Sequence, residues 1–251
     1  MGLGLRHPAK LGDMTRPHDA MAPVYDLVYQ EDFGEFYHWL TDTTLDVVRE
    51  LVPVGARIVD FGAATGRMAL PLAQAGYRIT AVEPSGPMID RLREAASGAD
   101  IECVQALMQD YDGKGRHDLA LCVFTVVIYL LDEAALRTAM QGACTSLKPG
   151  GLLLIDIPSR ELFHNRRVRK RRLQRTVTLR SLGGDLFDYT EKVVLGDVLG
   201  GGSYADRFTI RCWSREQVLQ AATGAGLQFE RDLSDRLEES GSQYLLLRRI
   251  R

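Results

Sequence analysis

A glycine-broken turn and one acidic residue are the features of the sequence best placed to do chemistry. In "DFGAATG", Gly62 and Gly66 stand four residues apart with Ala64 between them, and Glu83 follows 21 residues after Gly62. A carboxylate at the end of the next strand can accept hydrogen bonds from both hydroxyls of a ribose. The dinucleotide fingerprint G-x-G-x-x-G needs its third glycine one residue later and a helix N-terminus aimed at a pyrophosphate. The turn therefore predicts a ligand with adenosine but no diphosphate, although a plain strand–turn–helix with an incidental acid has a similar pattern.

The elements that must position this turn follow an alternating rhythm up to Pro158. Continuous apolar strands alternate with amphipathic helices, which is typical of a parallel sheet covered on both faces. We expect helices over residues 35–51, 67–76, 87–98 and 133–147, and strands over residues 57–62, 77–83, 101–107, 117–124 and 152–157.

The rhythm changes after Pro158. Three segments around Gly-rich turns alternate apolar and polar residues, which indicates antiparallel strands inserted over one end of the main sheet. A helix then begins after Ser214, with Gln217 placed to complete a capping box, and two closing strands follow. We expect a flexible leader over residues 1–22 and one domain over 23–251, in which residues 160–212 form the inserted acceptor-side strands.

Composition sets limits on the function. The chain has 251 residues, 45% of them hydrophobic and 25% charged, and a net charge of −2, which gives no general sign of nucleic-acid or membrane binding. Its longest apolar run, from Leu119 to Leu131, is shorter than the roughly 20 residues of a membrane-spanning helix. No basic-then-apolar leader opens the chain. We expect a cytoplasmic protein that does not enter a membrane.

Neither cysteines nor histidines suggest a metal. The four cysteines, at positions 103, 122, 144 and 212, show no CxxC spacing, and no HxxxH or clustered acidic motif occurs. The cysteines are expected to be buried small apolar residues in a reducing compartment.

Four stretches together carry a resemblance to a known family. "VDFGAATGR", "AVEPSGPMI", "HDLALCVFTVVIYL" and "LKPGGLLLIDI", in this order and spacing, resemble the class I methyltransferases that use S-adenosylmethionine. The resemblance covers roughly residues 22–251. It implies an α/β fold, a Rossmann-like doubly wound seven-stranded sheet whose last strand is antiparallel, with the small inserted antiparallel sheet.

The resemblance also implies where the cofactor lies. "GAATG" would wrap the methionine end of S-adenosylmethionine, Glu83 would hold the ribose, and Met88 would lie beneath the adenine. The product would be S-adenosylhomocysteine. The residues expected to bind the cofactor are Tyr25, Asp60, Gly62, Ala63, Gly66, Glu83, Pro84, Met88, Leu107, Met108 and Cys122.

Two positions depart from the family pattern. Ala64 replaces the middle glycine, a change that is tolerable if the residue keeps a negative φ. Leu107 stands where many relatives have an aspartate that accepts from the adenine amino group. The backbone around Leu107 and Met108 would then hold the adenine. Asp110 is either a substitute for that aspartate or a solvated loop acid, and we favour the loop.

The acceptor is expected in the crevice at the carboxyl ends of the strands, where strand order reverses. In similar methyltransferases the "YD" segment folds down as a lid, and Tyr25 and Tyr29 fit that reading, although a helix packing its aromatic residues on the sheet edge is the alternative. A base is needed only if the acceptor must lose a proton. Tyr129 and His38 are the catalytic candidates, with Asp156 and His164 also facing the crevice, and the acceptor would be lined by Tyr29, Phe124, Thr125 and Tyr129.

The run from Arg166 to Arg175 contains seven basic residues. We interpret it as a solvated helix or arm, with an anionic acceptor or RNA phosphates as the alternatives. The expected function is methyl transfer to O or N of a small molecule, such as an amino sugar, an amine or a secondary metabolite, by a monomer or homodimer. A tRNA methyltransferase and a non-catalytic S-adenosylmethionine-binding protein are the alternatives, with nucleic acid the less favoured partner.

Overall fold

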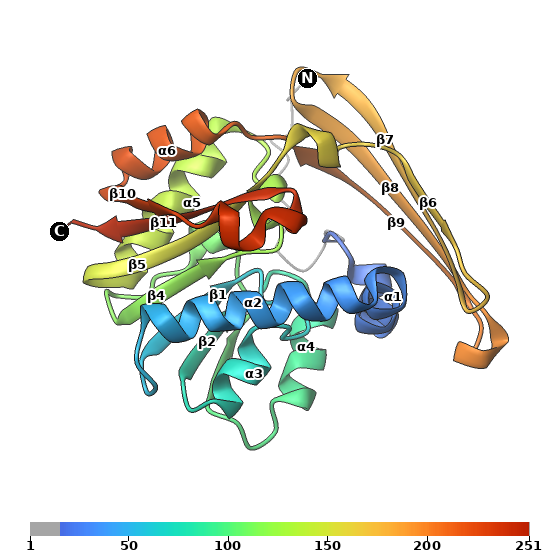
Figure 1. The fold of residues 1–251 in the computed structure, drawn as a ribbon, viewed down its shortest axis with the longest axis horizontal. Coiled ribbons are helices and arrows are strands. Elements are labelled where there is room, and N and C mark those ends of the chain that lie inside the picture. Colours follow the sequence, from blue (N-terminus) through green and yellow to red (C-terminus); the bar gives the residue numbers. More distant parts are fainter. Residues whose placement is uncertain (1–15, 251) are drawn as a thin grey trace, which may run out of the picture.

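A computed structural model describes residues 16–250, which fold around two β-sheets (Figure 1). The larger sheet has seven strands in the order β10-β11-β5-β4-β1-β2-β3. Strand β11 pairs antiparallel with both of its neighbours, and the remaining pairs are parallel. This confirms the predicted Rossmann-like sheet with an antiparallel last strand. The strands are β1 (Arg57–Phe61), β2 (Arg78–Val82), β3 (Ile101–Val104), β4 (His117–Cys122), β5 (Leu147–Pro158), β10 (Leu227–Asp232) and β11 (Ser242–Arg249).

Helices cover both faces of this sheet because every central strand is apolar on both sides. In β1, Ile58 packs into one core and Val59 into the other, and both side chains are fully buried. One face carries α2 (Glu35–Leu51), α3 (Ala69–Gln74) and α4 (Gly86–Ala95), and the other carries α5 (Glu133–Ser146) and α6 (Arg215–Gly224). The predicted capping box of Ser214 and Gln217 is present at the start of α6.

The smaller sheet is antiparallel throughout and curves away from the main sheet (Figure 1). Its strands are β6 (Arg166–Arg169), β7 (Leu173–Gly183), β8 (Leu186–Leu195) and β9 (Ser203–Arg211), in that order. A separate apolar cluster joins it to the N-terminal helix α1 (Tyr25–Phe33) and the preceding 3₁₀ helix η2 (Asp19–Val24). Met21 and Val28 meet Leu173 and Val193 in this cluster. The curved sheet therefore forms a roof over the N-terminal helices.

Two expectations need correction. Residues 16–22 are not a flexible leader, because Met21 is fully buried and His18 is 8% exposed; residues 1–15 lie outside the described part of the chain. The basic run is not a helix or arm, because it forms β6, the turn after it and the start of β7. Most of its basic side chains are exposed, but Arg175 is 4% exposed. Within residues 16–250 no helix has the length and apolar character needed to cross a bilayer.

Candidate active site

The turn after β1 requires glycine at two positions. Gly62 and Gly66 have φ values of +71° and +102°, a region that residues with a side chain rarely adopt. A Cβ on Gly62 would lie 2.5 Å from Cγ2 of Val126, and a Cβ on Gly66 would lie 2.5 Å from Cδ1 of Leu92. The turn is therefore packed so closely that only glycine fits, as its sequence predicts.

Ala64 differs from the expectation of a negative φ, since its φ is +47°. Its backbone N–H donates to Oε2 of Glu83 at 2.9 Å. The turn between the two glycines therefore folds back onto the carboxylate at the end of β2. The left-handed conformation costs an alanine energy that a glycine would not lose.

Glu83 is held from two sides and is 7% exposed. Its Oε1 accepts the backbone N–H of Ser85 at 2.9 Å, so each oxygen has one hydrogen bond and one further lone pair. Burial raises the pKa of Glu83 to about 7, and burial together with the charge of Glu83 raises the pKa of Asp60 to about 7. Neither carboxylate is in an ion pair with any residue in 16–250. Two buried acids without a cation fit a ligand that carries ribose hydroxyls and a positive sulfonium.

Residues 16–29 cover this part of the site. The Ser85 hydroxyl donates to Oδ1 of Asp19, and the Thr65 hydroxyl donates to Oδ1 of Asp26, both at 2.5 Å. The small cavity left beneath has a volume of about 50 Å³, whereas ligand pockets usually measure about 300–1,000 Å³. Its lining contains four of the residues expected to bind the cofactor, namely Tyr25, Asp60, Gly62 and Ala63. The other lining residues are Tyr29, Tyr37, Ala64, Arg67, Met68, Val123 and Phe124.

The remaining expected cofactor residues lie around the ends of β2, β3 and β4. Met88 and Met108 are buried, Pro84 and Leu107 are half-buried, and Cys122 is wholly buried in the core, where burial raises the pKa of its thiol. Asp110 is exposed beside Leu107, which agrees with a loop acid. Cys122 belongs to the packing of the sheet and is in the lining of neither cavity described here.

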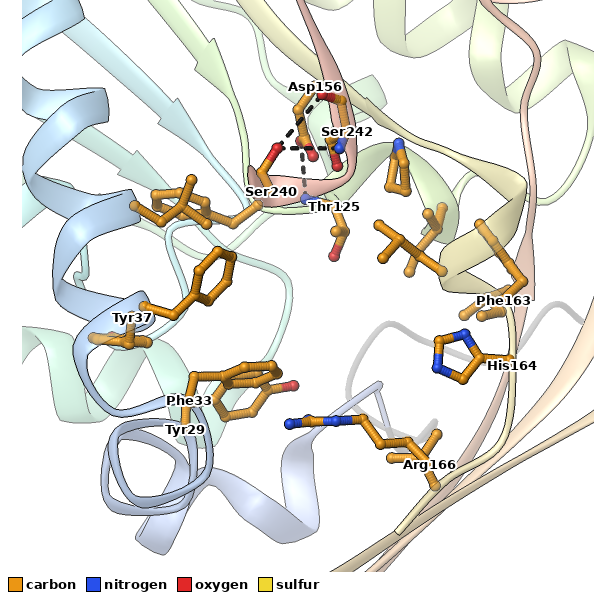
Figure 2. A pocket seen from close by; sticks show the side chains of 18 of the residues that line it. Tyr29, Phe33, Tyr37, Thr125, Asp156, Phe163, His164, Arg166, Ser240 and Ser242 are labelled. Atoms are coloured by element: carbon orange, nitrogen blue, oxygen red, sulfur yellow. Dashed lines mark hydrogen bonds between the residues drawn. The ribbon is translucent and has the colours of Figure 1, made fainter. Parts of the chain in front are cut away.

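A larger cavity of about 430 Å³ lies next to the first, between α1, α2, the end of β5 and the roof sheet (Figure 2). We name it the acceptor cavity. Most of its wall is aromatic or aliphatic, and Tyr29, Phe124 and Thr125 are among its lining residues, whereas Tyr129 is not. The two cavities share four lining residues, namely Tyr29, Tyr37, Arg67 and Phe124.

Arg67 and Tyr37 are the residues of this shared wall that sequence reasoning missed. The Arg67 side chain contacts both Tyr37 and Phe124. Its guanidinium lies 3.9 Å from the ring centroid of Tyr37 and 3.7 Å from that of Phe124. It also donates to the Tyr37 carbonyl at 2.9 Å and to the Thr41 hydroxyl at 2.8 Å. The only signal in the sequence is its place directly after Gly66, since its partners come from α2 and from the loop after β4.

Both catalytic candidates lie away from the acceptor cavity. His38 is exposed on α2, and its neighbour Tyr37 lines the cavity instead. Tyr129, at the end of the 3₁₀ helix η4 (Val126–Tyr129), shares a 2.8 Å hydrogen bond between its hydroxyl and Nε2 of His18. Burial raises the pKa of Tyr129 well above its usual value. The other two candidates, Asp156 and His164, do line the cavity.

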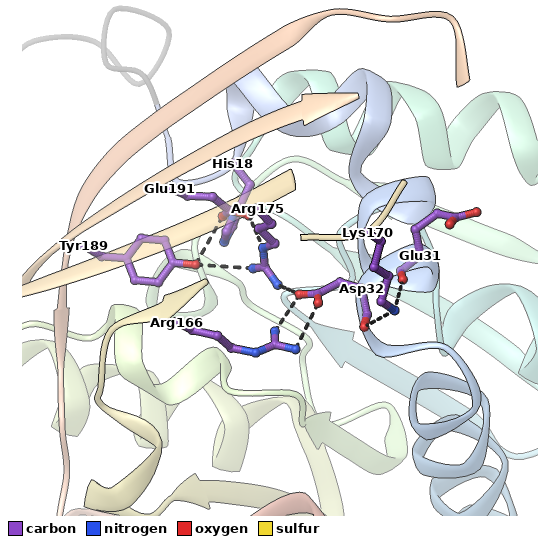
Figure 3. Close-up of polar contacts among 8 residues, drawn as sticks. All are labelled: His18, Glu31, Asp32, Arg166, Lys170, Arg175, Tyr189 and Glu191. Atoms are coloured by element: carbon purple, nitrogen blue, oxygen red, sulfur yellow. Dashed lines mark hydrogen bonds and ion pairs between the residues drawn. The ribbon is translucent and has the colours of Figure 1, made fainter. Parts of the chain in front are cut away.

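The roof and α1 are joined by a buried ionic network (Figure 3). Asp32 of α1 accepts hydrogen bonds from Arg166 of β6 and from Arg175 of β7, and Arg175 also donates to Glu191 of β8 at 2.7 Å. Lys170 donates to the carbonyls of Glu31 and Asp32 at the end of α1. Four of the seven basic residues of the run therefore hold α1, because Arg172 also pairs with Glu31 at 2.9 Å.

Known sequences resemble the chain over its central part. Residues 58–151 match the family model described as the methyltransferase domain. A protein of Geobacillus sp. (strain WCH70) with the name "Putative methyltransferase" is 33% identical over 105 residues, which are 41% of this chain and 42% of that protein. The tRNA 5-carboxymethoxyuridine methyltransferase of Escherichia coli (strain K12) is 26% identical over 111 residues, which are 43% of this chain and 42% of that protein. The chain thus spans about two fifths of the length of these relatives.

Solved structures share the fold over nearly the whole chain. An S-adenosylmethionine-dependent methyltransferase from Clostridium acetobutylicum gives a TM-score of 0.76 at 15% identity, over 92% of this chain and 98% of that one. The sugar N-methyltransferase KedS8 from Streptoalloteichus sp. gives a TM-score of 0.71 at 22% identity, over 100% of this chain and 99% of that one. At these identities the likeness establishes the fold. Residues 58–151 thus match a methyltransferase domain, and the fold around them is the one found in S-adenosylmethionine-dependent methyltransferases.

Proposed function

We propose that this protein transfers the methyl group of S-adenosylmethionine to a nitrogen or oxygen of a small molecule. The observation that carries the proposal is the wall that the two cavities share. Tyr29, Tyr37, Arg67 and Phe124 contribute to both linings, so a ligand in one cavity lies against a ligand in the other.

Methyl transfer asks the protein mainly for placement. S-adenosylmethionine supplies a methyl group that its sulfonium has already activated. The residues of the shared wall would hold the acceptor atom about 3 Å from that methyl and in line with it, and the roof would keep water out. Burial raises the pKa of Tyr29 to about 12, so its hydroxyl stays neutral and can donate a hydrogen bond at the junction.

A small acceptor suits the covered cavity better than RNA does. Its volume of about 430 Å³ is within the range of small-molecule sites, and most of its wall is apolar. The basic run is the only feature of the sequence that supports an RNA substrate. Four of its side chains already pair with α1, namely those of Arg166, Lys170, Arg172 and Arg175. The sugar N-methyltransferase that shares the fold over the whole chain also supports a small acceptor.

The test is a screen for acceptors by S-adenosylhomocysteine production. Amino sugars, aliphatic and aromatic amines, phenols and alcohols form one arm, and bulk tRNA forms the other. We expect turnover with at least one small molecule and none with tRNA. Turnover with tRNA alone would move the assignment to the tRNA methyltransferases, and S-adenosylmethionine binding without turnover in either arm would favour a non-catalytic binding protein.

The basic run gives this screen one double variant. The side chains of Arg169 and Arg171 are exposed and have no hydrogen-bond or ion-pair partner within the part of the chain that the structure describes. Replacing both with Gln should leave turnover of a small acceptor unchanged. With RNA as the acceptor, two lost phosphate contacts should reduce the slope of log affinity against log salt by about 0.7 to 0.9 each.

A further inference from the structure

Asp156 is a buried carboxyl at the carboxyl end of β5, and it faces the acceptor cavity (Figure 2). Asp156 is only 1% exposed to solvent. Oδ1 accepts the backbone N–H of Thr125 at 2.9 Å, which fixes the orientation of the carboxyl group. Each carboxylate oxygen has two lone pairs, so the carboxyl group can still accept a hydrogen bond from a ligand after it has accepted those of Thr125 and Ser242.

The residues around Asp156 are held in an unusual conformation. Phe124 and Thr125 have φ values of +63° and +71°, so two consecutive residues with side chains are in the left-handed region. Such conformations cost energy and persist where the surrounding structure enforces them, often at functional sites. Here the Thr125 N–H donates to Asp156, and both residues line the acceptor cavity.

The charge of Asp156 is only partly balanced. It is in no ion pair with any residue in 16–250. The ionisable groups that affect it are Arg67 beside α3, Cys122 on β4 and Tyr244 on β11, while the Ser242 hydroxyl donates a hydrogen bond to it. Arg67 directs its donors at Tyr37 and Thr41. Burial raises the pKa of Asp156 to about 7, so the carboxyl can both hold and release a proton near neutral pH.

The rest of the cavity suits an apolar body next to a positive group. Rings of Tyr29, Phe33, Tyr37 and Phe163 form much of the wall. Aromatic faces accommodate apolar groups and also attract cations. A buried carboxylate is stabilised most by a ligand cation that donates a hydrogen bond.

We propose that Asp156 receives the amino group of the acceptor, and that the acceptor is an amine carried on an apolar or aromatic body. The inference rests on the proposed function and narrows its substrate to nitrogen nucleophiles. The Asp156 carboxylate takes one proton from the acceptor's ammonium, which frees the nitrogen lone pair. The lone pair forms the new N–C bond while the C–S bond breaks, and the electron pair of that bond stays on sulfur. The proton on Asp156 then leaves to solvent.

The test compares two probes of the same shape, benzylamine and benzyl alcohol, on protein saturated with S-adenosylhomocysteine. Calorimetry at pH 8, where Asp156 is ionised and benzylamine is protonated, should show at least tenfold tighter binding of benzylamine. Asp156→Asn keeps an oxygen for the Thr125 N–H but carries no charge, so it should abolish this preference. Glu239→Gln removes the exposed carboxyl of the same cavity and should leave the preference intact.

The wild-type protein provides a second measurement that needs no variant. Between pH 8 and pH 5.5 Asp156 becomes protonated, so the preference for benzylamine should shrink severalfold. A preference that persists in Asp156→Asn, that is unchanged at pH 5.5, or that is absent from the wild-type protein overturns the inference. Failure to bind S-adenosylhomocysteine at all would instead overturn the proposed function, so the two failures are distinguishable.

Discussion

Arg175 of β7 donates to the carboxylate of Asp32 of α1 at 2.6 Å, and both side chains are buried. Arg166 completes the contact with two further hydrogen bonds to the same carboxylate. Helix α1 carries Tyr25, Tyr29 and Phe33 into the two cavities. This ionic contact therefore fixes the wall between the cavities to the roof sheet.

Asp32→Asn should destabilise the protein strongly. The substitution leaves two guanidinium groups facing an uncharged amide, and breaking a buried ion pair by removing one partner costs about 3–5 kcal/mol. Because Arg166 is partly exposed, we expect a loss of about 3 kcal/mol in the free energy of unfolding, measured with urea. Asp46→Asn is the control, since its pair with Arg49 is exposed and should contribute less than about 1 kcal/mol. Equal losses in the two variants would show that the Asp32 contact does not hold α1.

Glu83→Ala should weaken binding of S-adenosylhomocysteine at least tenfold. Hydrogen bonds to a charged group contribute about 1.5–3 kcal/mol each, and the proposed site uses Glu83 for two ribose hydroxyls. Glu83→Gln keeps one acceptor oxygen and should lose less. Calorimetry gives both affinities, and thermal unfolding checks that each variant folds. A dissociation constant equal to that of the wild-type protein would place the ribose elsewhere.

Cofactor affinity should also depend on pH. The pKa of Glu83 is raised from 4.5 to about 7, so the carboxylate that we propose accepts both ribose hydroxyls is present above pH 7 and is lost as the pH falls. We expect the affinity for S-adenosylhomocysteine to fall about tenfold from pH 8 to pH 6. In Glu83→Gln this part of the pH dependence should disappear. An affinity that is constant over this range would contradict a role for ionised Glu83.

The left-handed turn offers a pair of opposite substitutions. Ala64→Gly removes a conformational cost of about 1–2 kcal/mol and adds back about 0.5–1 kcal/mol of chain entropy, so the free energy of unfolding should rise by up to about 1.5 kcal/mol. Gly62→Ala places a Cβ 2.5 Å from Val126 and should lower the free energy of unfolding by about 2 kcal/mol or more. Urea denaturation of both variants decides the matter. A stabilising Gly62→Ala would mean that the turn is built differently.

The main sheet and its helices could be predicted from the sequence, because local patterns determine them. Helix α2 begins and ends where its apolar spacing predicts, at Glu35 and Leu51. The glycine turn and Glu83 could be placed as well, since each lies at the end of an apolar strand.

The acceptor side could not be predicted in the same way. Whether Tyr37 or His38 faces the cavity depends on how α2 is rotated against the sheet, and neighbouring helix positions differ by about 100°. The partners of Asp32 and Tyr129 lie 143 and 111 residues away along the chain. The roof brings these residues together, and no local pattern in the basic run reveals that it pairs with α1.

The most direct test of the account is a crystal structure of the protein with S-adenosylhomocysteine. The account predicts that the ribose hydroxyls donate to Glu83 and that the sulfur faces the wall formed by Tyr29, Tyr37, Arg67 and Phe124, with the acceptor cavity beyond it. It also predicts that residues 16–29 shift, because the cavity of about 50 Å³ beneath them is too small for the ligand. The proposed methyl transfer would be contradicted if S-adenosylhomocysteine were bound inside the acceptor cavity, or if its sulfur pointed away from the shared wall.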